Sequence, residues 1–169
     1  MLYPTDTVWG IGCDATSEEA VVKVFEIKKR SESKSLVILV DSVEMLKKHV
    51  PNVSKAVLEL LSKTTNPTTI IYDNPVGLAK NLVTADNTVA IRMVQNEFCK
   101  QLIHQFGKPI VSTSANISGN PTPKSFKEIE VSILDSVAYV VNLQREEVNE
   151  KSSTILKVSE KGEITVLRN

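Results

Sequence analysis

The chain is organised around one stretch, Pro109-Ile110-Val111-Ser112-Thr113-Ser114-Ala115-Asn116-Ile117-Ser118-Gly119-Asn120-Pro121-Thr122-Pro123. Its β-branched start predicts a buried strand, and its glycine and prolines predict a loop after the small hydroxyl and amide side chains. Ligands of open α/β sheets bind beyond the carboxyl ends of strands, so this loop suits a phosphate, a ribose or a small polar substrate. The alternative is a polar turn whose serine and asparagine side chains cap the next helix.

Helical and strand-like apolar patterns alternate on both sides of this stretch. Helices are predicted at residues 17–29, 43–49, 53–61 and 97–106, the first with Thr16 and Glu19 in a capping box, and 124–131 is a further candidate. Strands are predicted at 35–40, 68–72, 88–93, 137–141, 154–158 and 164–168. A mobile loop is expected at 144–153, and a turn at Lys161-Gly162. This interleaving predicts the α/β class, as a single domain over 1–169 with a twisted, mixed open sheet and helices packed on it.

The composition narrows the class of protein. Lys and Arg together number 20, as do Asp and Glu, so no global basic field recruits nucleic acid, although a local basic patch stays possible. The two cysteines, Cys13 and Cys99, are too few for a disulfide framework or a zinc cluster and fit a reduced, cytoplasmic compartment. The longest aliphatic run, at 36–40, is far too short to span a membrane, and no signal peptide is expected because Asp6 interrupts the first residues.

The sequence carries no signature of covalent catalysis. It lacks a G-x-S-x-G nucleophile elbow and a Walker A loop, and His49 and His104 lie in predicted helices without metal-ligand spacing. We therefore expect no metal held by the protein itself. An enzyme built from these residues would work by positioning and electrostatics.

Two sets of cations have two interpretations each. Lys28-Lys29-Arg30 ends a predicted helix, where cations offset the helix dipole by about 0.3–1 kcal/mol, but the same cluster could bind phosphate. Arg92 ends the apolar strand Val89-Ala90-Ile91, where a cation needs a partner. It forms either a structural salt bridge or a two-pronged clamp on a substrate carboxylate.

Four separated motifs occur in order along the chain: Pro4-Thr5-Asp6-Thr7-Val8-Trp9-Gly10-Ile11-Gly12, Lys28-Lys29-Arg30 with Lys34-Ser35-Leu36, Thr88-Val89-Ala90-Ile91-Arg92, and Ser112-Thr113-Ser114-Ala115-Asn116-Ile117-Ser118-Gly119. A fifth, weaker motif is Lys151-Ser152-Ser153-Thr154-Ile155, followed by Val166-Leu167-Arg168. Together they resemble the motifs of the threonylcarbamoyl-AMP synthase family, also called YrdC-like proteins, across nearly the whole chain.

The resemblance implies a fold and a reaction. Such enzymes combine L-threonine, bicarbonate and ATP into threonylcarbamoyl-AMP and pyrophosphate, with Mg2+ held mainly by the ATP phosphates. The product supplies the threonylcarbamoyladenosine modification of tRNA, so a downstream tRNA-modifying transferase complex is an expected partner and RNA contact is possible. No membrane partner is expected.

The resemblance also implies roles for individual residues. Lys28, Arg30 and Arg92 would be catalytic, and Thr7, Arg92, Ser112 and Ser153 would bind threonine. The ATP site would comprise Lys28, Arg30, Lys34, Thr88, Ser114, Asn116, Thr122 and Arg168.

The sequence departs from the family pattern at several places. Ser31 and Ser35 stand where the family usually has prolines, Trp9 replaces a usual tyrosine, and Asn66-Pro67-Thr68-Thr69 is a reduced form of a Pro-Gly-Pro-Leu-Thr segment. The chain also starts at the first motif, so the family's first helix and strand are expected to be missing. Two alternatives follow: a module that binds double-stranded RNA, or a nucleotide-binding paralogue without synthase activity. Carbamoyl transfer within a larger maturation protein is disfavoured because no zinc spacing is present.

Overall fold

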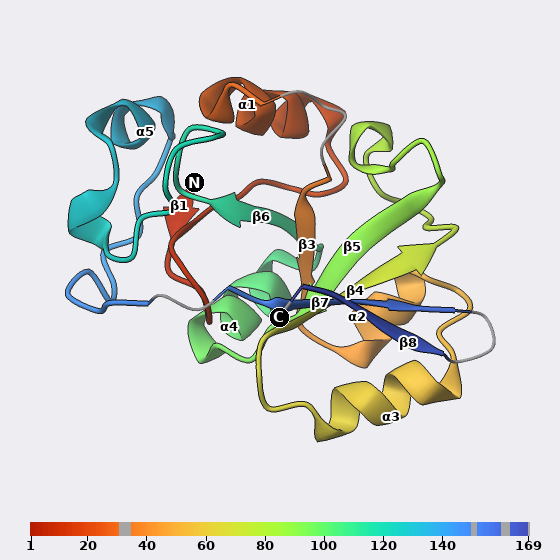
Figure 1. Cartoon of the computed structure of the whole chain (residues 1–169). Coiled ribbons are helices and arrows are strands. Elements are labelled where there is room, and N and C mark those ends of the chain that lie inside the picture. Colours follow the sequence, from red (N-terminus) through yellow and green to blue (C-terminus); the bar gives the residue numbers. More distant parts are fainter. Residues whose placement is uncertain (31–34, 150–151, 160–162, 169) are drawn as a thin grey trace.

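A computed structural model gives the fold and describes residues 1–30, 35–149, 152–159 and 163–168 (Figure 1). Its strands are β1 (Leu2–Tyr3), β2 (Gly10–Ile11), β3 (Val37–Val40), β4 (Thr68–Asp73), β5 (Thr88–Met93), β6 (Ile110–Ser114), β7 (Thr154–Val158) and β8 (Ile164–Arg168). Its helices are α1 (Glu18–Lys28), α2 (Val43–His49), α3 (Lys55–Lys63), α4 (Glu97–Phe106) and α5 (Val131–Ser136), with short 3-10 turns η1 (Lys80–Leu82) and η2 (Phe126–Glu128). Within this described part, none of the helices has the length and hydrophobicity that crossing a bilayer requires.

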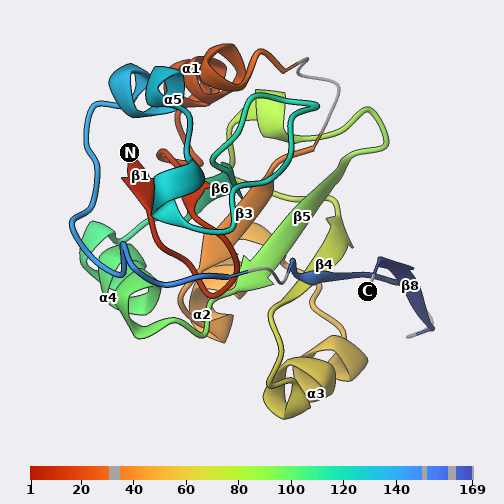
Figure 2. The ribbon, with the colours of Figure 1, turned by 60° about the vertical axis from the view of Figure 1, so that its left-hand side comes forward.

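The described strands form one sheet in the order β1-β2-β6-β3-β5-β4-β7-β8. β3 is parallel to β5 and β4 is parallel to β7, whereas the other neighbours are antiparallel. Figure 2 shows α1 and α5 together at one end of the molecule, α3 at the other, and β8 at the outer edge of the sheet. The predicted α/β class with a mixed sheet is therefore confirmed. β1 and β2 were missed because two residues are too few to show an alternating pattern.

Alternation along the central strands separates a core face from a polar face. Ile38 of β3 is opposite Ile91 of β5, Ile91 is opposite Ile70 of β4, and all three are at most 2% exposed. Burial of each such side chain stabilises the fold by roughly 1.5–3 kcal/mol. The residues between them point the other way, so that Val37 is opposite Ser112 and Thr69 is opposite Arg92. The polar side chains that matter below therefore start from rigid strands.

The helix ends follow the sequence with one shift. The N-cap of α1 is Ser17, whose hydroxyl accepts the amide of Ala20, so the predicted capping box beginning at Thr16 is wrong by one residue. Thr16 is held elsewhere, because its amide and its hydroxyl both donate to a carboxylate oxygen of Asp14, at 2.7 and 2.6 Å. At the end of α4, Gly107 has φ +73°, which confirms the predicted glycine C-cap.

The segment after the hydroxyl loop differs most from the prediction. In place of a helix at 124–131 and a strand at 137–141, the chain forms η2 and then α5. Val140 makes a single isolated bridge with Leu2, because the two-residue strand β1 offers no longer edge for pairing. The loop expected to be mobile is partly tied down, since the amide of Asn149 donates to the carbonyl of Lys124 at 2.8 Å. The predicted turn at Lys161-Gly162 lies outside the described residues.

Candidate active site

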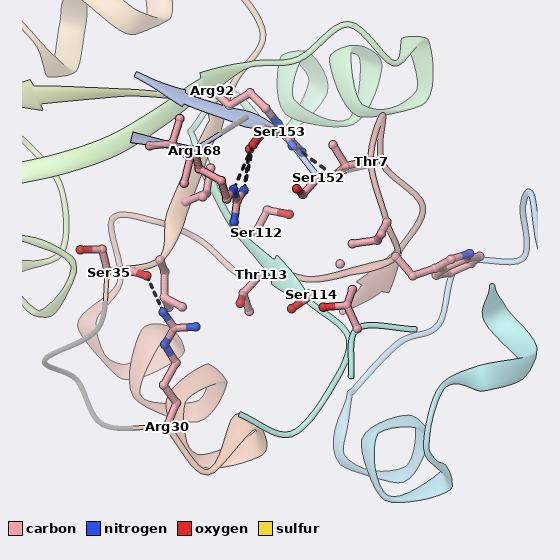
Figure 3. A pocket seen from close by; sticks show the side chains of 17 residues that line it. Thr7, Arg30, Ser35, Arg92, Ser112, Thr113, Ser114, Ser152, Ser153 and Arg168 are labelled. Carbon is pink, nitrogen blue, oxygen red and sulfur yellow. Dashed lines mark hydrogen bonds between the residues drawn. The ribbon is translucent and has the colours of Figure 1, made fainter. Parts of the chain in front are cut away.

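A pocket of about 530 Å3 lies where β2, β3, β5 and β6 meet the start of β7 (Figure 3). Residues that are distant in the sequence come together in it, and among the described residues that line it none carries a carboxylate. It carries three guanidinium groups, so its chemistry suits an anionic ligand. The sequence-predicted residues in its lining are Thr7, Arg30, Arg92, Ser112, Ser114, Thr122, Ser153 and Arg168.

Other predicted residues lie outside this lining. Lys28 and Asn116 are buried behind the loop, and Thr88 is buried at the start of β5, where its hydroxyl is 2.7 Å from that of Thr84. Lys34 lies outside the described residues. The structure thus separates the predicted residues that line this pocket from those that do not.

The pocket has two unlike parts. We name the first the buried wall: Thr7, Arg92, Ser112 and Ser153, each between 4% and 6% exposed. We name the second the open rim: Arg30, which is half-buried, with the exposed Ser35, Thr122 and Arg168. Figure 3 shows Arg30 and Ser35 apart from the buried wall, whereas Arg168 lies beside Ser153.

Arg92 is the centre of the buried wall. Its Nη2 atom lies 3.0 Å from an Asp6 carboxylate oxygen, and its Nη1 donates to the Thr7 hydroxyl at 3.1 Å. Its Nε has no hydrogen-bond partner among the described residues. The structural salt bridge is therefore present, while the carboxylate clamp stays a prediction: Arg92 lines the pocket and keeps an unpaired N–H donor.

Ser153 is held from two sides. Its hydroxyl is 2.9 Å from the hydroxyl of Thr69, and Arg168 donates to its carbonyl at 2.9 Å. The sequence analysis did not predict a role for Thr69. A threonine pair at the start of an apolar strand was the available signal, but only the pairing of β4 with β7 brings Thr69 to Ser153.

Lys28 holds the loop rather than facing the pocket. Its ammonium donates to the carbonyls of Ser114 and Asn116, at 2.5 and 2.8 Å, and to the Asn116 side chain at 3.3 Å. Burial, with a smaller repulsion from Arg30, lowers the pKa of the Lys28 amine to about 8. The predicted phosphate contact of Lys28 therefore becomes a positional role in this structure.

Asn116 completes the same brace. Its side-chain oxygen accepts from the Ser114 hydroxyl at 2.6 Å, and its amide nitrogen donates to the carbonyl of Asn120 at 2.7 Å. With both ends of the amide occupied, the side chain fixes the turn after β6. No helix follows this loop directly, so its polar side chains are not the helix caps considered as the alternative.

Gly10 sets the space beside Ser112. A Cβ at this position would lie 2.9 Å from the Ser112 hydroxyl and 3.3 Å from the Thr5 methyl. Only a glycine leaves the Ser112 hydroxyl where it is. Next to Gly10, Trp9 lines the pocket and packs on Phe126, with ring centroids 4.9 Å apart.

The described residues contain no group of three His, Cys, Asp or Glu side chains arranged to hold a metal ion. The cysteines are poor nucleophiles, since burial raises the pKa of the Cys13 and Cys99 thiols to about 12. The groups that remain in the pocket are arginines and hydroxyls. These bind, orient and neutralise a ligand without reacting with it.

Comparison with protein families and with curated proteins gives consistent matches. The family model of the Sua5/yciO/yrdC proteins, described as "Telomere recombination", matches residues 1–169. The threonylcarbamoyl-AMP synthase of Pseudoalteromonas translucida (strain TAC 125) is 32% identical over 145 residues, which cover 84% of this chain and 78% of that protein. The synthase of Escherichia coli (strain K12) is 32% identical over 130 residues, covering 75% and 68%.

Solved structures of proteins from the same family have a similar fold. Sua5 of P. abyssi in complex with L-threonine superposes with a TM-score of 0.86 at 27% identity, covering 99% of this chain and 49% of that one. The chain therefore spans about half the length of that protein. E. coli YciO has a TM-score of 0.84 at 19% identity, covering 99% and 81%, which is a likeness of fold.

Proposed function

The chain belongs to the Sua5/yciO/yrdC family, and on this premise we propose that it is an L-threonylcarbamoyladenylate synthase. The reaction joins L-threonine, bicarbonate and ATP and releases pyrophosphate. One observation carries the proposal: a buried wall with a partly unpaired guanidinium stands in the same pocket as an arginine-bearing open rim.

We place the amino acid at the buried wall. A free carboxylate beside Arg92 would meet a guanidinium whose Nε is unpaired, and the hydroxyls of Thr7, Ser112 and Ser153 would surround the polar groups on the amino acid. A site that buries such groups rejects ligands without matching polar atoms, because its own groups would lose their partners. This wall therefore suits a small, polar and zwitterionic substrate.

We place ATP at the open rim. The guanidiniums of Arg30 and Arg168 would face the triphosphate, and the hydroxyls of Ser114 and Thr122 lie in the same lining. Since these residues are half-buried or exposed, they leave room for a ligand much larger than an amino acid. The conformation of the triphosphate at the rim stays a prediction.

The chemistry then needs proximity and charge neutralisation. Bicarbonate takes up a proton and loses water to give CO2, and the amine of threonine adds to CO2 and releases a proton to form a carbamate. A carbamate oxygen then attacks the α-phosphorus, and pyrophosphate leaves. Arg30 would offset the charge that develops on the phosphoryl oxygens, and the wall would hold the carbamate in line. Mg2+ carried on the ATP phosphates would add to this neutralisation. The described lining residues offer hydroxyls and no carboxylate, which fits a metal that arrives with the nucleotide.

The test is pyrophosphate release. The pure protein is incubated with ATP and Mg2+, with and without L-threonine and bicarbonate. We expect release that requires both, is lost in Thr7→Val and survives in Lys23→Ala, which removes a cation from the exposed face of α1. Tight ATP binding without threonine-dependent release would instead identify a nucleotide-binding paralogue.

The product is a reactive mixed anhydride, so an acceptor must consume it. We propose that a tRNA-modifying transferase complex is that acceptor. Contact with RNA by this chain itself stays a prediction, and a strongly salt-dependent affinity for RNA would support it.

A further inference from the structure

The hydroxyl of Thr5 makes three hydrogen-bond contacts, two of them with Thr7 of the buried wall, and Thr5 is 4% exposed. It donates to the carbonyl of Val8 at 2.8 Å, it accepts the amide of Thr7 at 3.0 Å, and its oxygen is 3.0 Å from the Thr7 hydroxyl oxygen. A hydroxyl has one hydrogen and two lone pairs, so these contacts use its full capacity.

The directions of these bonds can be assigned from that capacity. A carbonyl cannot donate, so the one hydrogen on Thr5 goes to Val8. The bond between the two threonines must then carry the hydrogen of Thr7, with Thr5 as the acceptor.

Counting donors and acceptors in the same way shows which hydrogen-bonding capacity of the Thr7 hydroxyl is left for a ligand. Its hydrogen is committed to Thr5, and one lone pair accepts from Arg92 Nη1 at 3.1 Å. Thr7 is 6% exposed and lines the pocket, as Figure 3 shows. What remains for a ligand is a single lone pair.

We propose that Thr5 is a positioning residue that locks Thr7 as a pure acceptor, so that the ligand atom facing Thr7 must be an N–H or O–H donor. The inference rests on the proposed function and deepens it. Arg92, beside Thr7, only donates hydrogen bonds and therefore binds only anionic or acceptor atoms of a ligand. Arg92 thus requires an acceptor and Thr7 a donor on adjacent groups of the ligand. A zwitterionic amino acid with a carboxylate next to a donor group meets both demands, whereas a dicarboxylate does not.

The test is a double-mutant cycle on the affinity for L-threonine, measured by isothermal titration. Thr5→Val keeps the shape of the side chain but removes the hydroxyl, and Thr7→Val removes the acceptor that faces the ligand. The loss of one oriented hydrogen bond predicts that Thr5→Val binds threonine about threefold to tenfold more weakly. In a Thr7→Val background, the Thr5 substitution should have no further effect, because Thr5 acts only through Thr7.

Two controls separate positioning from general damage. Thr5→Ser keeps the hydroxyl and should retain affinity. Thr68→Val removes the hydroxyl of a buried threonine outside the pocket lining, and should leave the affinity for threonine unchanged. ATP affinity should be unchanged in both Thr5 variants.

A separate measurement on the unaltered protein covers the case in which Thr5→Val does not fold. NMR of the protein with isotope-labelled threonine residues should find the hydroxyl proton of Thr7 in slow exchange with water and directed at Thr5. A proton directed at the pocket, or additive losses in the cycle, would overturn the inference. If the unaltered protein does not bind threonine at all, the proposed function fails instead, and the proton direction from NMR still decides the inference.

Discussion

The buried wall and the open rim use the same residue types under opposite conditions. In the wall, Asp6 fixes Arg92, Thr5 fixes Thr7 and Thr69 fixes Ser153. On the rim, Arg30 donates to the carbonyl of Ser35 at 2.8 Å, and Arg168 to that of Ser153. Both rim arginines therefore keep donors available beside solvent.

The difference teaches how one pocket can treat two substrates differently. Buried polar groups are costly without partners, so the wall discriminates strongly but accepts only a small ligand of matching polarity. Exposed cations contribute less each and are screened by salt, so the rim binds charge with little demand on shape. The contrast predicts effects of different size for substitutions in the two parts.

The largest expected effect concerns Lys28, which is buried like the wall and holds the loop after β6. Burial lowers its pKa to about 8 from an ordinary 10.5, so between these pH values the unfolded chain binds more protons than the folded one. The free energy of unfolding should therefore rise with pH across this window, on the order of 3 kcal/mol relative to Lys28→Met. Below pH 8 both states are protonated and the difference between the two proteins should be constant.

Denaturant titrations of both proteins at several pH values measure this difference. The buried thiols of Cys13 and Cys99, whose pKa burial raises to about 12, act in the opposite direction but are common to both proteins and cancel. A flat difference between pH 8 and 10.5 would mean that Lys28 is solvated like the rim.

The next effect concerns Arg92. Arg92→Lys keeps the charge, but one ammonium cannot serve Asp6, Thr7 and a carboxylate fork together. We expect threonine affinity to fall about tenfold to a hundredfold, which corresponds to about 1.5–3 kcal/mol, while ATP binding survives. Isothermal titration with threonine and with ATP separates the effects on the two affinities. An unchanged affinity for threonine would leave Arg92 as a structural salt bridge only.

A smaller effect is expected at Gly10. Gly10→Ala places a methyl group 2.9 Å from the Ser112 hydroxyl, which must rotate away from the ligand. The loss of one neutral hydrogen bond of about 1 kcal/mol predicts roughly fivefold weaker threonine binding. The matched background is Ser112→Ala, in which the colliding oxygen is gone. There, the Gly10 substitution should cause no further loss, and a second full loss would contradict the proposed collision.

The smallest effect is expected on the rim. Arg30→Ala should weaken ATP binding by less than about fivefold, with little change in melting temperature, since a partly exposed cation contributes about 1 kcal/mol or less. The loss should shrink as salt rises. Lys23→Ala removes the same charge from the exposed face of α1 and serves as the control. A sharp fall in melting with unchanged ATP affinity would assign Arg30 to the structure alone.

Much of the site could be predicted because its residues stand on elements with strong local patterns. Thr88–Met93 is a strand as expected, and the strand expected at Ile110-Val111 continues to Ser114; the two bring Arg92 and Ser112 to one pocket. Lys28, which the structure places outside the pocket lining, and Thr69, for which the sequence predicted no role, share one property: their partners are distant in the chain. Lys28 is 86 residues from Ser114, and Thr69 is 84 residues from Ser153.

The sequence by itself determined the class of fold, the family and a set of candidate polar residues, because alternation, helix caps and motif order are local properties. Only the tertiary structure decided which of those residues face a ligand. A buried polar atom must find a partner wherever the packed strands and loops place one. For this reason Lys28 and Asn116 lie outside the pocket lining, Arg92 pairs with Asp6, and the hydroxyl of Thr7 donates to Thr5.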